Sequence, residues 1–419
     1  MAALSKLLLV SAPLLAALYA LLAPRIDVAG LRRLPHSATN IGDCTPLDGL
    51  EACEDAWVHH ESGLAYLACS SLPSRSVWQP AGALLDGPEQ LAATASRPDA
   101  LRLFDFSTRT HSEVRLEGLP KDDSSRGRVY LHGLDVLSSP TDPDELYLFL
   151  ISHRPRLPAE ASAQQGADSV VEVFRTRVGS STAQYVRTLR HEALLKTPNN
   201  LVADAAALKE GKAAFWASND HARRLGWERN VEMVWHKPSE IVYCEASLEG
   251  EDEPECKVAA EGIQYPNGMV KGPNDLLYSA STFTGEVSVW EIQQVDKTLL
   301  PVDTVPLHRP IDNLQVSPTT GAIFAATFPK LLAFGDAAPS PGKPDTPKHV
   351  KSPVEIWRVA NETGEAQFYG QKYATSIALA DPDSKVVSAI TSAAPYKDQL
   401  LLTGFFSPDA ALCKMPEVL

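Results

Sequence analysis

The amino-acid sequence predicts an all-β protein built as a six-bladed β-propeller, preceded by a hydrophobic helix at the N-terminus. Short apolar, β-branched and aromatic runs recur along the 419-residue chain, and one polar-then-apolar unit repeats between turn residues. The 32 prolines and 24 glycines are spread along the chain, which agrees with many turns joining short strands. Long amphipathic helices are scarce, and the best candidate for one lies around residues 201–209.

The first element is an apolar segment. Lys6 precedes a nearly unbroken apolar run over residues 7–23, which Pro24 and Arg25 close. This length fits a long signal peptide or a short membrane anchor, and the lack of an A-x-A site before Pro24 favours retention as an anchor. We therefore expect residues 1–25 to be a signal peptide or signal anchor that can associate with a membrane or lipid. Residues 40–419 then form the propeller, either secreted or anchored on the lumenal or extracellular side.

A series of strand-like runs follows the apolar segment. Strands at this spacing, with turn residues between them, favour a sandwich, a barrel or a propeller. The runs that we expect as strands cover residues 64–68, 101–106, 145–151, 170–176, 240–244, 275–281, 286–292, 322–327, 354–360 and 399–405.

A repeated unit distinguishes among these architectures. In each copy a short polar cluster opens a weak strand, a turn follows, and a strongly apolar strand comes next. A sixth, less polar copy begins at Ser388. The first strand of every propeller blade lines the central channel, so the clusters should converge at one end of it. Any single cluster is more simply a turn, but five in register favour a site. The polar residues of these clusters include Glu54, His132, Asn199, Asn267 and Asp312.

The six cysteines suit an oxidising compartment, and none forms a C-x-x-C pair of the kind used in zinc or thioredoxin-like chemistry. Cys44 precedes the first blade and Cys413 lies near the end of the last one. A disulfide between them would close the ring and stabilise the fold by about 4–5 kcal/mol on the chain-entropy model. Local Cys53–Cys69 and Cys244–Cys256 bridges also fit the sequence, but six cysteines allow many pairings, and we expect only the ring closure.

Charge and one short motif bear on partners and compartment. The formal net charge of −14 disfavours nucleic acid as a partner and is compatible with a cation site. Asn361 begins an Asn-Glu-Thr glycosylation sequon, which agrees with entry into the secretory pathway.

The converging polar clusters would present only oxygen donors to a metal ion. Mixed carboxylate and amide oxygens suit calcium, whereas zinc favours histidine or cysteine. Two carboxylates balance the charge of one Ca²⁺ and leave positions for water and a substrate oxygen. The predicted ligands are Glu54, Asn199, Asn267, Asp312 and Asn313.

The sequence carries no G-x-S-x-G elbow, no H-E-x-x-H motif and no glycine-rich phosphate loop. Hydrolysis would therefore depend on the metal ion, which can polarise a carbonyl and stabilise the resulting oxyanion. His132 is the histidine at a channel-opening position and is the candidate general base. His153, at the end of the next strand, is placed to set the tautomer of His132, although a structural role is as simple a reading of this residue.

The same residues resemble ordered motifs of the animal paraoxonase/arylesterase family, from about Cys44 to Cys413. Overall identity is low, but the motifs are specific and occur in order. They are Glu54-Asp55, His132-Gly133, His153, Asn199-Asn200, Ser218-Asn219-Asp220-His221, Asn267-Gly268 and Asp312-Asn313.

The resemblance implies a six-bladed propeller that hydrolyses lactones and aryl esters with two calcium ions in its channel. It makes the five predicted ligands those of a catalytic ion, and Asp55 and Asn200 those of a second, structural ion. The family has an aspartate where this chain has Asn200, so one negative charge is lost and a weaker or empty second site follows. It also leaves Glu54 or Asp312, acting on a metal-bound water, as an alternative general base.

The resemblance also implies a closing Cys44–Cys413 disulfide, a retained hydrophobic N-terminus, and two extra segments near the entrance, residues 154–168 and 332–352.

Two other hypotheses about function stay open. One is a non-catalytic propeller that keeps calcium as a structural pin and binds a protein partner. The other is a different propeller chemistry, such as sugar-lactone hydrolysis or strictosidine-synthase-like condensation. The complete ligand set favours a calcium-dependent hydrolase that acts on a small lactone or ester.

Overall fold

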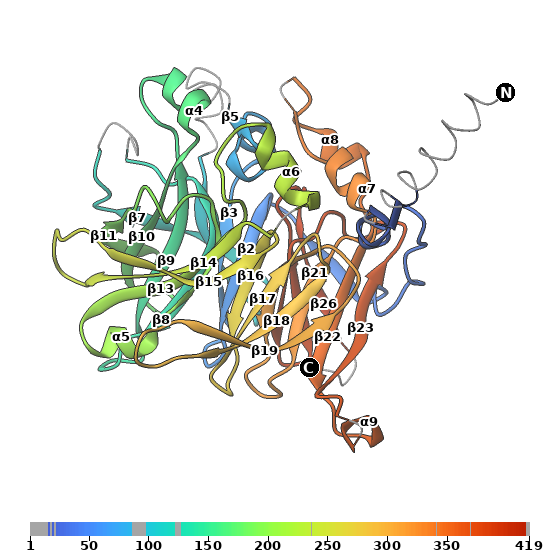
Figure 1. Cartoon of the computed structure of the whole chain (residues 1–419). Coiled ribbons are helices and arrows are strands. Elements are labelled where there is room, and N and C mark those ends of the chain that lie inside the picture. Colours follow the sequence, from blue (N-terminus) through green and yellow to red (C-terminus); the bar gives the residue numbers. More distant parts are fainter. Residues whose placement is uncertain are drawn as a thin grey trace.

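The computed structural model describes residues 16, 19, 20, 22–85, 98–121, 127–235, 237–340, 342–368 and 370–415 of the chain. Strands dominate it, and they are arranged as blades around a central channel with short helices gathered over one face (Figure 1). The predicted six-bladed propeller is confirmed.

Each blade is a four-stranded antiparallel sheet, numbered from the channel outward. The first blade holds β2 (Cys53–His59), β3 (Leu64–Cys69), β6 (Ala100–Asp105) and β7 (Thr110–Glu117). The second holds β8 (Leu131–Ser138), β9 (Glu145–Arg154), β10 (Asp168–Arg177) and β11 (Thr182–Leu189). The third holds β12 (Pro198–Ala203), β13 (Lys212–Asn219), β14 (Ser239–Ser247) and β15 (Glu255–Ile263). A short parallel pairing of β7 with β11 joins the outer edges of the first two blades.

The remaining blades follow in chain order. The fourth holds β16 (Pro266–Lys271), β17 (Leu276–Ser281), β18 (Glu286–Ile292) and β19 (Leu299–Pro306). The fifth holds β20 (Ile311–Val316), β21 (Ile323–Thr327), β22 (Val354–Asn361) and β23 (Tyr373–Asp381). The sixth holds β24 (Ser392–Tyr396), β25 (Gln399–Thr403) and β26 (Ala410–Lys414), and its outer strand is β1 (Cys44–Leu47). A strand from the start of the chain therefore completes the last blade, while β24 packs beside β2 to close the inner ring.

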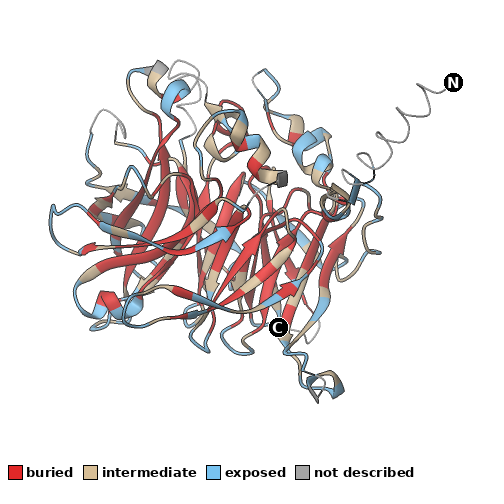
Figure 2. Ribbon diagram, viewed as in Figure 1, coloured by how far each residue is buried: buried red, intermediate tan, exposed pale blue. Residues whose placement is uncertain are grey.

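The hydrophobic core consists of layers between neighbouring blades. Six large apolar clusters are each contributed by two adjacent sheets, including the pair formed by the last and first blades. Strand interiors are accordingly buried while the outer connections are exposed (Figure 2). Strands buried on both faces read as continuous apolar runs, which explains why the sequence located them.

Connections on one face of the ring carry most of the helices. Because strands within a blade alternate in direction, the start of the inner strand and the link from the second to the third strand lie on the same face. These links contain α2 (Leu72–Arg75), β4 (Trp78–Gln79), η1 (Pro80–Gly82), β5 (Leu84–Leu85), α4 (Ala159–Gln165), α6 (Trp227–Trp235), α7 (Leu331–Asp336) and α8 (Thr346–His349). On the opposite face, α5 (Ala205–Lys209) and α9 (Glu365–Phe368) lie in other connections.

The helix predicted around residues 201–209 is wrong in its first part. Residues up to Ala203 belong to β12, where Leu201 and Val202 are buried in layers between blades. The helix starts only after Asp204, whose carboxylate accepts a hydrogen bond from the N–H of Ala206 as an N-cap. Burial in the third blade therefore overrides the helical pattern of the apolar residues.

The predicted N-terminal apolar run lies mostly outside the described residues. At the end of this run the structure describes a helix over residues 22–28. Within the described part of the chain, no helix is long and apolar enough to cross a membrane.

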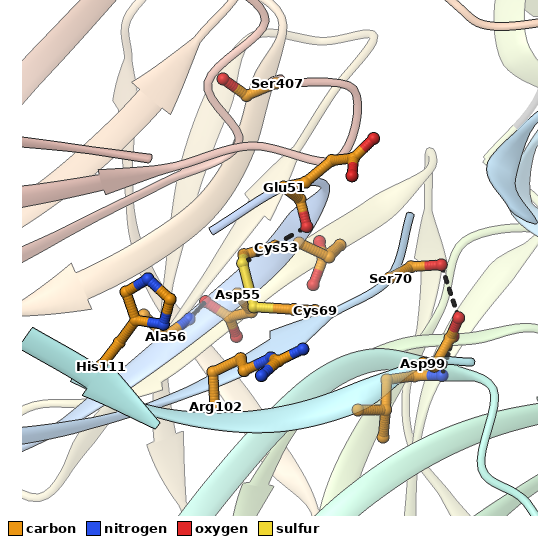
Figure 3. The surroundings of a disulfide bond; sticks show 12 residues. Glu51, Cys53, Asp55, Ala56, Cys69, Ser70, Asp99, Arg102, His111 and Ser407 are labelled. Carbon is orange, nitrogen blue, oxygen red and sulfur yellow. Dashed lines mark hydrogen bonds between the residues drawn. A yellow bond between two sulfur atoms is a disulfide. The ribbon is translucent and has the colours of Figure 1, made fainter. Parts of the chain in front are cut away.

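All six cysteines are paired as disulfides. Cys44–Cys413 joins β1 to β26 across 369 residues of sequence and covalently closes the ring, as predicted. Cys53–Cys69 links β2 to β3 beside Asp55 (Figure 3), and Cys244–Cys256 links β14 to β15. Three disulfides are typical of chains that fold in the secretory pathway.

We expect the ring-closing disulfide to stabilise the fold more than a local one. Replacing both Cys44 and Cys413 by serine should lower the free energy of unfolding by about 4–5 kcal/mol, because the bridge constrains a very long loop of the unfolded chain. The matched control replaces both Cys244 and Cys256, which enclose a short loop and should cost about 3 kcal/mol. Urea unfolding of both variants measures the difference. A larger loss in the control would contradict this account.

Candidate functional site

The site is built where the inner strands bulge. In each of the first five blades, the pairing of the inner strand with the second strand shifts register at its polar cluster, whereas β24 pairs with β25 without a shift. A bulge leaves a residue outside the regular ladder and redirects its side chain. The shifts fall between Cys53 and Asp55, Leu131 and Leu134, Pro198 and Asn200, Pro266 and Met269, and Ile311 and Leu314.

Two glycines within these bulges allow adjacent inner strands to approach closely. A Cβ atom added to Gly133 would lie 2.6 Å from the carbonyl oxygen of Asn199. One added to Gly268 would lie 2.3 Å from Cα of Asn313 and 2.7 Å from the carbonyl oxygen of Asp312. Any other residue would force the inner strands apart, which explains why glycine follows His132 and Asn267.

Hydroxyl groups hold the bulged backbones across blade boundaries. Ser218 on β13 donates to the carbonyl oxygen of Asn267 at 2.7 Å, which joins the third blade to the fourth. Thr282 donates to the carbonyl oxygen of Ile311 at 2.8 Å, and Thr391 to that of Glu54 at 2.7 Å. Sequence reasoning placed Ser218 in the Ser-Asn-Asp-His motif without a role, and it did not single out Thr282 or Thr391, because a lone threonine has no distinguishing pattern.

The bulges open into a cavity of about 410 Å³ at the face that carries the helices. Of the sequence-predicted residues, Glu54, His132, Asn199, Asn267 and Asp312 line it together. The side chains come from five different blades, as convergence on the channel requires. The cavity also contains residues that the sequence did not single out, among them Gln79, Arg229, Asn230, Tyr265 and Phe405.

Three oxygen atoms in this cavity lack hydrogen-bond partners among the described residues. They are Oε2 of Glu54, Oδ1 of Asn199 and Oδ1 of Asn267, and all three residues are buried. A buried acceptor without a partner is costly, so such atoms indicate a ligand. Carboxylate and amide oxygens are the donors that calcium prefers, and these residues therefore fit a calcium ion.

The electrostatics of the two carboxylates favour the binding of a cation. Burial raises the pKa of Glu54 well above its ordinary value, and the neighbouring Asp55 and Asp312 carboxylates raise it further. Burial likewise raises the pKa of Asp312 to about 8, with Asp55 adding to the effect and a hydrogen bond from Asn267 opposing it. A divalent cation between Glu54 and Asp312 would remove this cost.

The other predicted ligands lie beside the cavity without lining it. Asp55 faces the opposite part of the channel, where it shares a second cavity with Leu134 and Gln315. Asn313 is fully buried and donates through Nδ2 to Oε1 of Glu54 at 2.6 Å. Asn200 lies between Asp55 and Asn313 and donates to both, at 3.0 and 2.8 Å. To bind a metal ion, the side-chain amide of Asn313 must rotate by half a turn. This rotation places Oδ1 where Nδ2 now lies and leaves the rest of the side chain nearly unchanged.

The two predicted catalytic histidines pack together. Their rings meet edge to face with centroids 5.1 Å apart, and Nε2 of each lacks a hydrogen-bond partner among the described residues. Nδ1 of His153 pairs with the hydroxyl of Ser169 at 2.8 Å. Burial is the main reason that the pKa of His132 falls well below its ordinary value, and nearby His153 and Arg75 lower it further. Burial also lowers the pKa of His153 to about 4, so both rings are neutral near pH 7.

The Ser-Asn-Asp-His motif contributes a second histidine, His221, to the cavity wall beside His132. Oδ1 of Asp220 and Nδ1 of His221 lie 2.8 Å apart. Burial would raise the pKa of Asp220, but His221, the charge of Arg229 and a hydrogen bond from Thr197 together lower it to about 2. Asn219 fixes the preceding loop by accepting from the N–H groups of Lys196 and Thr197. Nε2 of His221 has no partner among the described residues, and the residue lines the cavity.

Connections from several blades cover the cavity. Arg229, Asn230 and Met233 reach it from α6, and Arg229 donates to the carbonyl oxygens of Pro80 and Ala81, which ties α6 to η1. The predicted extra segment 332–352 supplies Phe334, Gly335 and Ala338 to the wall.

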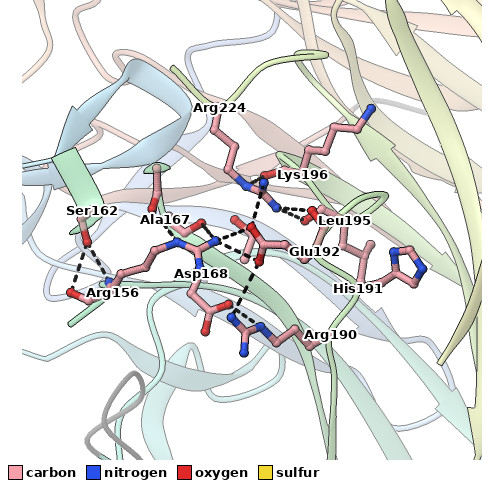
Figure 4. Close-up of polar contacts among 12 residues, drawn as sticks. Arg156, Ser162, Ala167, Asp168, Arg190, His191, Glu192, Leu195, Lys196 and Arg224 are labelled. Carbon is pink, nitrogen blue, oxygen red and sulfur yellow. Dashed lines mark hydrogen bonds and ion pairs between the residues drawn. The ribbon is translucent and has the colours of Figure 1, made fainter. Parts of the chain in front are cut away.

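The other extra segment, residues 154–168, lies beside the cover rather than in the cavity wall. Its side chains join a network of ion pairs at the edge of the second blade (Figure 4). Arg156 donates to both carboxylate oxygens of Glu192 at 2.8 and 3.0 Å, and Arg224 contacts the same carboxylate at 3.1 Å. Arg190 contacts Asp168 at 2.8 Å. This network attaches the segment to the connection between the second and third blades.

We expect Gly268→Ala to destabilise the protein by about 1–3 kcal/mol, because the added methyl group overlaps the backbone of β20 and must displace it. The matched control is Gly42→Ala, because a Cβ there would meet no atom within 4 Å. Chemical denaturation of both variants tests the role of close strand approach. If Gly268→Ala and Gly42→Ala had equal free energies of unfolding, the inner strands would be able to move apart without cost.

The buried His153 makes stability depend on pH. Its pKa of 6.5 in the unfolded chain falls to about 4 on folding, so the unfolded chain takes up the proton first as pH drops. This residue should therefore remove on the order of 3 kcal/mol of stability between about pH 6.5 and pH 4. His153→Gln cannot titrate and should lose less stability over that interval. Denaturation curves at several pH values compare the two proteins, and parallel losses would show that His153 does not titrate in this way.

Comparison with known proteins indicates the family of the chain. A sequence profile of the arylesterase family matches residues 69–414. Serum paraoxonase/arylesterase 1 of Homo sapiens is 26% identical over 283 residues, 66% of each protein. Serum paraoxonase/arylesterase 1 of Rattus norvegicus is 23% identical over 383 residues, 89% of each. Serum paraoxonase/lactonase 3 of Mus musculus is 25% identical over 379 residues, 88% of each.

Solved structures show only a distant likeness. A glucose dehydrogenase superposes with a TM-score of 0.48 and 13% identity, covering 90% of this chain and 99% of that one. A luciferin-regenerating enzyme superposes with a TM-score of 0.47 and 11% identity, covering 90% and 96%. These likenesses carry no inference about activity. The profile match spans most of the chain, and the chain therefore belongs to the arylesterase family.

Proposed function

We propose that this protein is a calcium-dependent hydrolase of lactones and aryl esters. The observation that carries the proposal is a group of three buried oxygens, of Glu54, Asn199 and Asn267, that have no hydrogen-bond partner in the described part of the chain. These residues line one cavity together with Asp312. Membership of the arylesterase family supports the same reaction class, and relatives named as arylesterases and lactonases point to these substrates.

The cavity residues supply two kinds of ligand to the ion. Glu54 and Asp312 supply two negative charges, and Asn199 and Asn267 supply neutral oxygens. Asn313 joins the set when its amide turns over, at the expense of the hydrogen bond that it accepts from Asn200. When bound, calcium supplies Lewis acidity that polarises a substrate carbonyl and stabilises negative charge on its oxygen.

His132 is the proposed general base. It lines the cavity, its ring is neutral near pH 7, and its Nε2 is without a hydrogen-bond partner among the described residues. A neutral imidazole can accept the proton that water loses as it attacks an ester or lactone carbonyl. His153 packs against the ring of His132 and acts as a positioning residue. Glu54 and Asp312 are the alternative base if substitution of His132 leaves the reaction rate unchanged.

The walls suit a largely apolar substrate. Met233, Phe334, Phe405 and Phe406 surround the polar floor, and Phe328 stacks on Phe334 with ring centroids 3.8 Å apart. An aryl group or the alkyl chain of a lactone would pack against these side chains, while its carbonyl points towards the floor.

The proposal includes the cellular setting. Asn361 is exposed at the end of β22, where a glycan can attach without disturbing the core. Three disulfides favour an oxidising compartment. We infer a secreted or membrane-anchored protein, with residues 1–25 as signal peptide or anchor and the propeller on the lumenal or extracellular side.

Purified protein should hydrolyse lactones and aryl esters, and EDTA should abolish the activity until calcium is restored. Asn267→Ala should lower kcat/KM by about 100-fold or more, as expected for removal of a group that stabilises the reacting centre. Asn274→Ala is the matched control, because Asn274 lies in the link between β16 and β17 at the other end of the same strand. Rates on lactones of varied ring and chain length measure both variants.

Activity that survives complete chelation would refute the proposal. Calcium-dependent thermal stability without turnover on a broad panel would favour the alternative of a calcium-pinned propeller that binds a protein partner.

A further inference from the structure

The two neighbouring carboxylates of β2 have opposite hydrogen-bonding states. Glu54 keeps one buried oxygen without a partner among the described residues. Asp55 receives donors on both oxygens. Its Oδ1 accepts from the N–H of Ala56, the hydroxyl of Ser392 and Nε2 of Gln315, and its Oδ2 accepts from Nδ2 of Asn200.

These four contacts lie between 2.9 and 3.0 Å. Oδ1 thus receives three donors, one more than its two lone-pair positions, while Oδ2 receives the Asn200 amide. A cation at Oδ2 would lie beside the N–H group of Asn200, which repels it. Glu54 is therefore better equipped than Asp55 to bind an ion.

The orientation of the Asn200 amide is fixed by its own surroundings. Its Oδ1 accepts from the N–H of Leu201 at 2.7 Å, so its Nδ2 must face Asp55 and Asn313. Turning the amide over would bring its oxygen against the Asp55 oxygen and its nitrogen against the N–H of Leu201. Both new contacts would be repulsive. The residue that would have to offer an oxygen to a second ion instead presents an N–H group.

We propose that the Asn200 amide replaces the second, structural cation, so that this chain binds a single calcium ion. The inference rests on the proposed function, because it assigns that ion to the cavity of Glu54, Asn199, Asn267 and Asp312. The N–H groups of Asn200 and Gln315 stabilise the Asp55 carboxylate in place of the cation's charge. An aspartate at position 200 would present a second negative charge to Asp55, and only a cation could then hold the two together.

The Asn200 amide also connects the strands that carry the ion site, so a second metal ion is not needed for that purpose. Asn200 on β12 spans from Asp55 on β2 to Asn313 on β20, and Asn313 contacts Glu54. Side chains of three blades are thus joined across the channel by hydrogen bonds from neutral amides. The bond from Asn200 to Asp55 does not involve Asn313, so the contact between β12 and β2 should persist when calcium is bound and when it is removed.

Isothermal titration of the chelated full-length protein with calcium tests the stoichiometry, with elemental analysis of the dialysed protein as an independent count. We expect one calcium ion per chain. Two ions per chain would overturn this inference and leave the proposed function intact. Failure to bind calcium at all would refute the proposed function as well.

A gain-of-site variant provides the second test. Asn200→Asp should raise the count to two ions per chain, and the double variant Asn200→Asp/Asp55→Asn should return it to one. Circular dichroism of each variant confirms that it folds. An unchanged count of one in folded Asn200→Asp would show that the amide is not what excludes the second ion, and would overturn the proposal.

Discussion

The close approach of bulged inner strands is the constraint on which the site depends. Register shifts at the start of five inner strands turn polar side chains into the channel, and the glycines at positions 133 and 268 let neighbouring strands come together there. Buried acceptors from separate blades can then share one cavity. Closure of the ring by β1 and its disulfide keeps the first and last blades, and hence Glu54 and Thr391, in contact.

Much of this arrangement could be predicted from the sequence because its signals are local. Strands buried on both faces form apolar runs, and a polar cluster at the start of each inner strand marks the repeat. The helix expected around residues 201–209 was wrong at its start because burial of Leu201 and Val202 between blades is a tertiary effect. The sequence indicated segment 332–352 near the entrance, and this segment lines the cavity. The rest of the cover could not be derived, since Arg229, Tyr265 and Phe405 reach the cavity from connections whose paths no repeat specifies.

The hydrogen bonds divide the channel into two chemically different parts. Near the helices, buried oxygens of Glu54, Asn199 and Asn267 have no hydrogen-bond partner in the described chain, which favours a cation there. Towards the other end, the amides of Asn200 and Gln315 supply the donors that Asp55 needs. We propose that these amides, rather than a second cation, hold this part of the channel together. His132, whose burial lowers its pKa well below the ordinary value, and the aromatic side chains of Tyr265, Phe334, Phe405 and Phe406 line the same cavity.

The location of bound metal tests the central claim most directly. Anomalous diffraction from crystals grown with a lanthanide, which takes calcium sites, should show one strong peak among the oxygens of Glu54, Asn199, Asn267 and Asp312. Metal–oxygen distances should lie at about 2.3–2.6 Å, the range of calcium in oxygen-ligand sites. A peak confined to the protein surface, or none in the channel, would contradict the account.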